Sequence, residues 1–185
     1  MNAVSAHQGP RIHVGQGEHV VSGDPDVMLS TILGSCVAAC LRDEKRRVGG
    51  MNHFLLPEGG GRQEDPAAAA RYGAHAMEVL INSLLKAGAR RENLTAKLFG
   101  GGRMFNDLMD IGANNCRFAE KFLTDEGIPV LGRSLGGRGA RRIHYWPESG
   151  RVFVRIVQES QQVAQDERRR IKESPATADG AVELF

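Results

Sequence analysis

Cys36 and His53 are the two residues of this chain whose types suit a thiol hydrolase. The thiolate is the reactive form of cysteine, and a free thiol with a pKa of about 8.5 is mostly protonated at neutral pH. A cysteine that attacks a carbonyl carbon therefore needs a neighbouring base, and histidine is the natural one. We expect Cys36 to act as the nucleophile and His53 as its base.

The apolar segments that carry these two residues, 36–41 and 48–56, are separated by the charged residues 42–47. Two apolar runs joined by a polar turn are typical of an antiparallel hairpin. With the turn centred between Glu44 and Lys45, the cysteine faces the histidine across the hairpin. Directly opposed residues hold their Cβ atoms about 4.5–5.5 Å apart, which is close enough for a thiolate–imidazolium pair.

Other side chains near the cysteine could complete a catalytic site. An amide hydrolase must meet the developing oxyanion with fixed donors, and a glycine beside the nucleophile lets backbone N–H groups approach the substrate. We therefore expect Gly34 and Ser35 to line the substrate site, together with Asn52 beside the histidine. A hydroxyl could orient the imidazole as the third member of a triad. The candidates for that role are Ser30, Thr31 and Ser35.

Taken singly, these residues have ordinary structural explanations. A lone cysteine in an apolar run is a small core residue about four times in five, and we keep that interpretation for Cys40 and Cys116. A lone histidine on a strand is a hydrogen-bonded structural residue about three times in four. The glycine run 100–102 lacks the Lys-Ser/Thr pair of a phosphate-binding loop. It predicts a tight turn that brings backbone close to the site.

Two helices and several short strands must position these residues. Residues 67–86 carry apolar side chains at helical spacing, and Gly88 is a natural left-handed cap for that helix. A second helix fits 115–126, and a second hairpin fits 141–157. We predict an α/β fold, a single-domain layered sandwich of short mixed strands with two main flanking helices. The predicted organisation is a loose leader at 1–11, the catalytic domain at 12–157 and a polar tail at 158–185 that is expected to be disordered.

The bulk composition excludes several other classes of protein. The chain is 41% hydrophobic and 25% charged, and its formal charge of +2 comes from 24 basic and 22 acidic residues. This balance gives no reason to expect a nucleic-acid partner. No apolar run approaches the length of a membrane span, and none of the three cysteines has the spacing of a metal site. We predict a reduced, cytoplasmic protein that holds no metal.

The chain resembles the CheD family of bacterial chemoreceptor glutamine deamidases in a set of segments that run in order from about Arg11 to Val157. No single segment is specific, but the combined set is. The matching segments are Gly17-Glu18, 33–37 (LGSCV), 50–57 (GMNHFLLP), 71–85 (RYGAHAMEVLINSLL), 97–104 (KLFGGGRM) and 135–137 (LGG).

This resemblance implies a protein-glutamine glutaminase that converts particular glutamines of methyl-accepting chemoreceptors to glutamate, without a cofactor. It implies a layered α/β sandwich, and many members of the family bind the CheC phosphatase. The family's Cys-His-Thr triad carries over onto Cys36 and His53, while its threonine position is occupied here by Ser30, with Thr31 next to it. Successive residues of a strand point to opposite faces, so both hydroxyls cannot face one site, and we favour Ser30.

Two alternatives remain open from the residues alone. One is another cysteine acyl-transfer hydrolase, which would cleave or cross-link its substrate instead of releasing ammonia from an intact protein. The other is a non-catalytic adaptor that binds receptors and a chemotaxis phosphatase through the same surface. Loss of deamidation on replacing Cys36 would separate the enzyme from the adaptor.

Overall fold

The computed structural model describes residues 9–57, 66–103 and 111–157 of this 185-residue chain. Most of the predicted leader and the whole predicted tail 158–185 lie outside the described residues. None of the helices in the described part is long and apolar enough to cross a membrane. In chain order the elements are β1 (Arg11–His13), β2 (His19–Ser22), β3 (Met28–Leu33), β4 (Val37–Asp43), β5 (Val48–Asn52), α1 (Pro66–Lys86), the short 3-10 helix η1 (Arg91–Asn93), β6 (Leu94–Gly100), α2 (Ile111–Asp125), β7 (Val130–Leu135), β8 (Ala140–Trp146) and β9 (Arg151–Val157).

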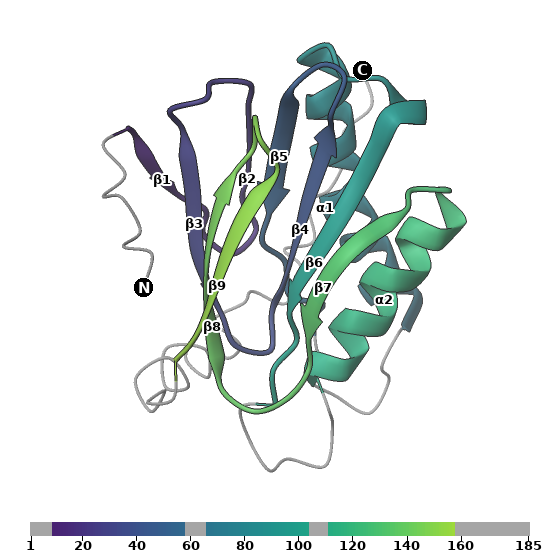
Figure 1. Cartoon of the computed structure of the whole chain (residues 1–185). Coiled ribbons are helices and arrows are strands. Elements are labelled where there is room, and N and C mark those ends of the chain that lie inside the picture. Colours follow the sequence, from purple (N-terminus) through teal and green to yellow (C-terminus); the bar gives the residue numbers. More distant parts are fainter. Residues whose placement is uncertain (1–8, 58–65, 104–110, 158–185) are drawn as a thin grey trace, which may run out of the picture.

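The strands of the described residues form two sheets that lie face to face. One sheet has the order β1-β3-β8-β9 and the other has the order β2-β5-β4-β6-β7. Both helices pack on the five-stranded sheet, on the side away from the four-stranded sheet (Figure 1). Parallel pairs occur at β1–β3 and β6–β7, and the other pairs are antiparallel. The predicted layered α/β sandwich of short mixed strands is confirmed.

Alternation along β4 explains why the molecule has two apolar layers. Val37, Ala39 and Leu41 pack with the helices, whereas Ala38 and Cys40 pack between the two sheets. Cys36, directly before β4, belongs to the layer between the sheets. Because successive side chains of a strand point to opposite faces, this assignment follows from the sequence positions alone. The nucleophile candidate therefore lies inside the sandwich, away from the helices.

The two predicted helices are confirmed with small changes at their ends. In α1 the predicted stripe is buried against the five-stranded sheet, and Gly88 follows with a φ of 96°, as expected for a left-handed cap. The second helix, α2, begins at Ile111, earlier than the predicted start at 115. It ends before Gly127, whose φ is 68°. The strand β1 was not predicted, because three exposed residues carry no clear alternation.

The first hairpin is confirmed, but its predicted register is wrong by two residues. Asp43 pairs with Val48 and Cys40 pairs with Met51, so the turn is centred one residue later than expected. The reason lies in the turn, where Arg47 has a φ of 53°. In addition, the backbone N–H of Arg46 donates to the carboxylate of Asp43 at 3.1 Å. This local capping selects a longer turn than the charge pattern suggested.

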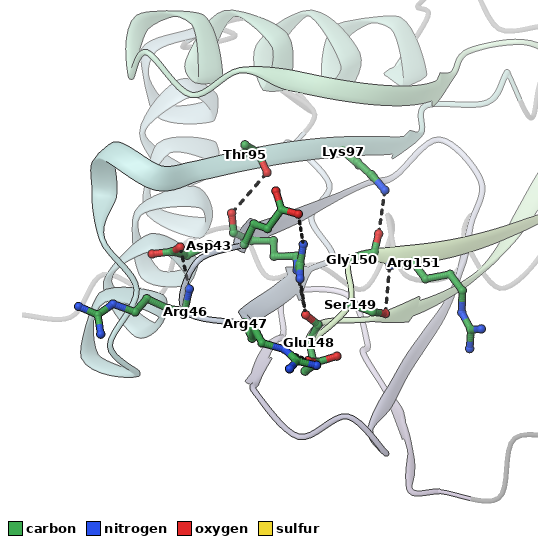
Figure 2. A network of polar contacts seen from close by, with 11 residues as sticks. Asp43, Arg46, Arg47, Thr95, Lys97, Glu148, Ser149, Gly150 and Arg151 are labelled. Carbon is green, nitrogen blue, oxygen red and sulfur yellow. Dashed lines mark hydrogen bonds and ion pairs between the residues drawn. The ribbon is translucent and has the colours of Figure 1, made fainter.

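A polar network ties this turn to the turn between β8 and β9 (Figure 2). Arg42 donates from Nε and Nη2 to the carbonyl oxygen of Glu148, at 2.9 and 2.6 Å. Lys97 donates to the carbonyl oxygen of Gly150 at 2.7 Å. Hydrogen bonds from charged donors to carbonyls are among the stronger ones in proteins. The two sheets are thus joined at the turn end of the first hairpin, opposite the end that carries Cys36.

Candidate active site

Cys36 lies at the end of a bend between β3 and β4 and is only 3% exposed. The glycine run after β6 passes against this bend. The N–H of Gly102 donates to the carbonyl of Gly34 at 2.7 Å, and the N–H of Gly101 donates to the carbonyl of Cys36 at 2.8 Å. A Cβ atom at Gly101 would lie 2.0 Å from the sulfur of Cys116, so glycine is required there. The prediction that this run brings backbone close to the site is confirmed.

Asn115 of α2 joins the cysteine bend to the segment that carries the histidine. Its Nδ2 donates to the carbonyl oxygen of Ser35 at 2.9 Å, and its Oδ1 accepts from the N–H of Leu56 at 2.9 Å. The side chain is fully buried, which makes both hydrogen bonds costly to lose. Asn115 was not among the predicted site residues, although an asparagine on the apolar face of a predicted helix is a signal of such a role. Ser35, a predicted substrate-site residue, is thereby held through its backbone.

His53 follows directly after β5 and is 4% exposed. Its backbone is clamped by the turn before β2. The N–H of His53 donates to the carbonyl of Glu18 at 3.1 Å, and its carbonyl accepts from the N–H of Gly17 at 2.7 Å. One residue further on, Phe54 and Val37 exchange backbone hydrogen bonds of 2.9 and 3.0 Å. The backbone around the histidine is therefore held from two sides, by the turn with Gly17 and Glu18 and by Val37 at the start of β4.

The cysteine and the histidine share one face of the five-stranded sheet. Since Val37 pairs with Phe54, His53 is directly opposite Ala38 and not opposite Cys36, which corrects the predicted pairing. A shift by two residues preserves the face, because side chains alternate with a period of two. The cysteine and the histidine are thus diagonal neighbours across the strand pair. Diagonal neighbours typically lie about 7–8 Å apart, a distance that long side chains can bridge.

The imidazole ring has its Nδ1 atom fixed by two oxygens. The hydroxyl oxygen of Thr31 lies 3.0 Å from Nδ1 of His53, and the carbonyl oxygen of Val14 lies 3.3 Å from the same atom. A carbonyl oxygen can only accept, so Nδ1 carries the proton of the neutral ring. Nε2 is then the nitrogen that can take a proton from a thiol. This is the tautomer that a general base requires.

The structure places the hydroxyl of Thr31, and not that of Ser30, against the histidine. Thr31 is 1% exposed and shares the inner face of β3 with Leu29 and Leu33, whereas Ser30 is on the outer face. The expectation that these neighbours point to opposite faces is confirmed, but the choice between them was wrong. It relied on a position transferred from the family. The two flanking leucines of β3 already mark which face is buried.

Asn52 is on the opposite face of the strand from His53. Its Oδ1 accepts from the N–H of Ala39 at 3.0 Å, and its Nδ2 donates to the carbonyl of Ala76 in α1 at 3.1 Å. The side chain is 2% exposed and joins the sheet to the helix. The structure therefore does not bring this predicted substrate-binding residue to the cysteine. Gly34, in contrast, is part of the cysteine bend, where its carbonyl accepts from the glycine run.

One side chain that was not predicted from the sequence, Gln16, reaches the sulfur of Cys36. The thiol of Cys36 donates to Oε1 of Gln16, with 3.7 Å between sulfur and oxygen. Gln16 belongs to the same turn that clamps His53, between Val14 and Glu18. A partly exposed glutamine in a short glycine-containing turn carries no periodic pattern, so no signal in the sequence pointed to it.

The other two cysteines have different surroundings. Burial raises the pKa of the Cys40 thiol far above its ordinary value and outweighs the opposing charge of Lys97. Cys40 therefore stays protonated and unreactive at neutral pH. Cys116 is 8% exposed and packs in the core beneath the helices. Their surroundings fit the structural role expected for both.

These groups place a thiol on the same sheet face as an imidazole whose Nδ1 is held by a hydroxyl and a carbonyl. That arrangement can carry out nucleophilic acyl transfer, the chemistry of cysteine hydrolases. The comparisons with known proteins are more specific. A family model described as CheD chemotactic sensory transduction matches residues 55–156. The chain belongs to the CheD family.

Relatives of known name match nearly the whole chain. The chain is 54% identical over 175 residues to the probable chemoreceptor glutamine deamidase CheD of Caulobacter sp. (strain K31), a match that covers 95% of this chain and 93% of the relative. It is 49% identical over 187 residues to the protein of the same name from Rhizobium meliloti (strain 1021), covering 100% of both. Among solved structures, Neisseria meningitidis protein NMB0706 is similar with a TM-score of 0.44 and 11% identity, over 70% of this chain and 64% of that one.

Proposed function

We propose that this protein is a cytoplasmic enzyme that deamidates glutamine side chains of methyl-accepting chemoreceptors, releasing ammonia and leaving glutamate. The family and the names of its relatives support this substrate. The observation that carries the mechanism is the fixed imidazole of His53, with Thr31 at 3.0 Å from Nδ1, on the sheet face that also carries Cys36. No other titratable pair is needed for the chemistry.

The reaction proceeds in two halves. Nε2 of His53 takes the proton of the Cys36 thiol, and the thiolate attacks the side-chain carbonyl carbon of the substrate glutamine. The tetrahedral intermediate collapses as His53 returns the proton to the leaving nitrogen, which departs as ammonia. A water molecule, deprotonated by the same imidazole, then hydrolyses the thioester to glutamate and restores the thiol.

Thr31 and Val14 serve this cycle by holding Nδ1. When the ring becomes an imidazolium, its Nδ1–H continues to donate to these oxygens, and hydrogen bonds to charged groups are stronger than neutral ones. The imidazolium form of His53 is therefore stabilised without any movement of the ring. We also propose, from the family alone, that a CheC-type phosphatase is a partner of this chain.

The test is mass spectrometry of purified chemoreceptor after incubation with the protein, together with ammonia release. Each deamidated glutamine should gain about 1 Da, and the receptor chain should remain intact. Cys36→Ala should abolish both signals while the variant keeps its fold, since trimming one small side chain costs little of the total stability. The matched control is Cys40→Ala, which removes the same atom from the same strand face.

Full activity of folded Cys36→Ala would refute the nucleophile assignment. Binding of receptor by the wild type without any ammonia release would favour the adaptor. Cleavage of the receptor chain would favour a different acyl-transfer enzyme.

A further inference from the structure

Gln16 touches the atom that the proposed mechanism makes reactive. Its Oε1 accepts from the thiol of Cys36 at 3.7 Å. The cysteine is 3% exposed, while Gln16 is only partly buried. An amide group therefore lies against the sulfur of Cys36.

The backbone of the turn that carries Gln16 is held at several points. The N–H of Val14 donates to the carbonyl of Ser30 at 2.9 Å, and the N–H of Gly17 donates to that of His53 at 2.7 Å. Within the turn, the carboxylate of Glu18 accepts from the N–H of Gly15 at 2.8 Å. Such a turn cannot swing away without breaking contacts to the histidine. Any response of Gln16 to the state of the sulfur must therefore come from rotation of its own side chain.

We propose that Gln16 is a catalytic residue whose side-chain amide stabilises the thiolate of Cys36 and then the oxyanion of the tetrahedral intermediate. This proposal rests on the proposed function of Cys36. In the resting enzyme the thiol donates to Oε1. Once the proton has moved to His53, a carbonyl oxygen facing a thiolate is repulsive, and a half-turn of the amide places Nε2–H there instead.

The same donor is then in place for the oxyanion. The negatively charged oxygen is bonded to the carbon that has just bonded to Sγ, so it develops next to the sulfur. A neutral amide on a fixed backbone can follow this charge with a small torsion. Removing one hydrogen-bond donor to the developing oxyanion typically costs about 10²- to 10³-fold in kcat in such enzymes.

A competing explanation is that Gln16 merely shields the sulfur and has to leave before the substrate glutamine can enter. The two explanations differ in what the side chain must supply. A donor needs the N–H group, whereas a shield needs only bulk. Methionine has nearly the size and shape of glutamine without its donors, and alanine lacks both the donors and the bulk.

The experiment therefore compares Gln16→Met and Gln16→Ala with wild type, with Asn82→Ala on the exposed face of α1 as the control for loss of an amide. We would measure kcat and KM for ammonia release from receptor, and the pH dependence of iodoacetamide labelling at Cys36. Both Gln16 variants should lose about 100-fold in kcat with little change in KM, as when one oxyanion donor is removed. Half-maximal labelling should move to higher pH in both, because the thiolate loses a donor. Asn82→Ala should match wild type.

Two outcomes would overturn the proposal. Faster labelling and undiminished kcat in Gln16→Ala, with Gln16→Met like wild type, would make Gln16 a shield. Wild-type kcat and wild-type labelling in both variants would leave it without a role. An active Cys36→Ala variant would instead refute the proposed function itself. The mass of the peptide that contains Gln16 should be checked in each preparation, so that its own deamidation does not confuse the comparison.

Discussion

Replacing Thr31 with valine tests which hydroxyl orients the catalytic imidazole. Valine has the shape of threonine, so the change exchanges a hydroxyl for a methyl group in a site that is 1% exposed. The lost hydrogen bond to Nδ1 of His53 has a length of 3.0 Å. A hydrogen bond to a charged group contributes about 1.5–3 kcal/mol, and 1.36 kcal/mol corresponds to a tenfold change in rate. We expect kcat to fall about 10- to 100-fold.

The loss should stay within that range because the Nδ1 proton keeps a second acceptor. The carbonyl oxygen of Val14 remains 3.3 Å from Nδ1, so the variant retains the tautomer with a basic Nε2. In a serine protease, loss of the correct tautomer costs about 10⁴-fold, which is far more than we expect here. We therefore expect the carbonyl of Val14 to limit the loss.

The assay is the initial rate of ammonia release at saturating receptor, with far-UV circular dichroism on each variant. Thr31→Ser keeps the hydroxyl and should recover most of the rate. Ser30→Ala is the matched control on the outer face of β3 and should be close to wild type. If Ser30→Ala is slow while Thr31→Val is unaffected, the hydrogen bond seen between Thr31 and His53 does not operate during catalysis.

Two further predictions concern stability and selectivity. Burial alone would raise the pKa of Asp43, but hydrogen bonds from the N–H groups of Arg90 and Arg46 outweigh it and hold that pKa below its ordinary value. Asp43→Asn should therefore lower the free energy of unfolding by about 2–3 kcal/mol at pH 7. In urea titrations this deficit should begin to shrink as the pH falls below about 4, and it should be lost as the pH falls through the lowered pKa of the folded state. At pH 8 iodoacetamide should label Cys36 and leave Cys40 unmodified in the folded protein, because burial raises the pKa of the Cys40 thiol. When the protein is unfolded in urea before labelling, peptide mass spectrometry should show both cysteines labelled. Labelling of Cys40 in the folded state would contradict its burial.

The main elements of this fold were predictable because they have strong local patterns. The apolar stripe of α1 has helical spacing, and the two hairpins alternate around polar turns. The pairing of β3 with β8, across more than a hundred residues, has no local signature and could not be predicted. The same is true of β1, whose three exposed residues form a strand only because β3 offers them a free edge.

The site was predictable in its chemistry but not in its geometry. Cys36 and His53 could be selected by residue type and by the resemblance to the family. The predicted register was wrong by two residues, an even number, so both side chains stayed on the same face. An error of one residue has the opposite consequence, because successive side chains of a strand point to opposite faces. The choice of Ser30 in place of its neighbour Thr31 is such an error. Gln16 and Asn115 reach the site through turns and packing that depend on the whole fold, so their roles required the structure.

The arrangement of hydrogen bonds explains how one hairpin can be both firmly anchored and chemically active. Its turn end is joined to the β8–β9 turn by charged side chains, such as Arg42 on the carbonyl of Glu148 (Figure 2). Its open end is joined by neutral groups: the glycine run lies against the cysteine bend, the Gln16 turn lies against His53, and the amide of Asn115 bridges the bend to Leu56. A fixed charge directly beside the thiol would shift its pKa independently of the imidazole. Neutral contacts hold the bend of the nucleophile in place, and in the proposed mechanism they leave His53 as the base that decides when the thiolate forms.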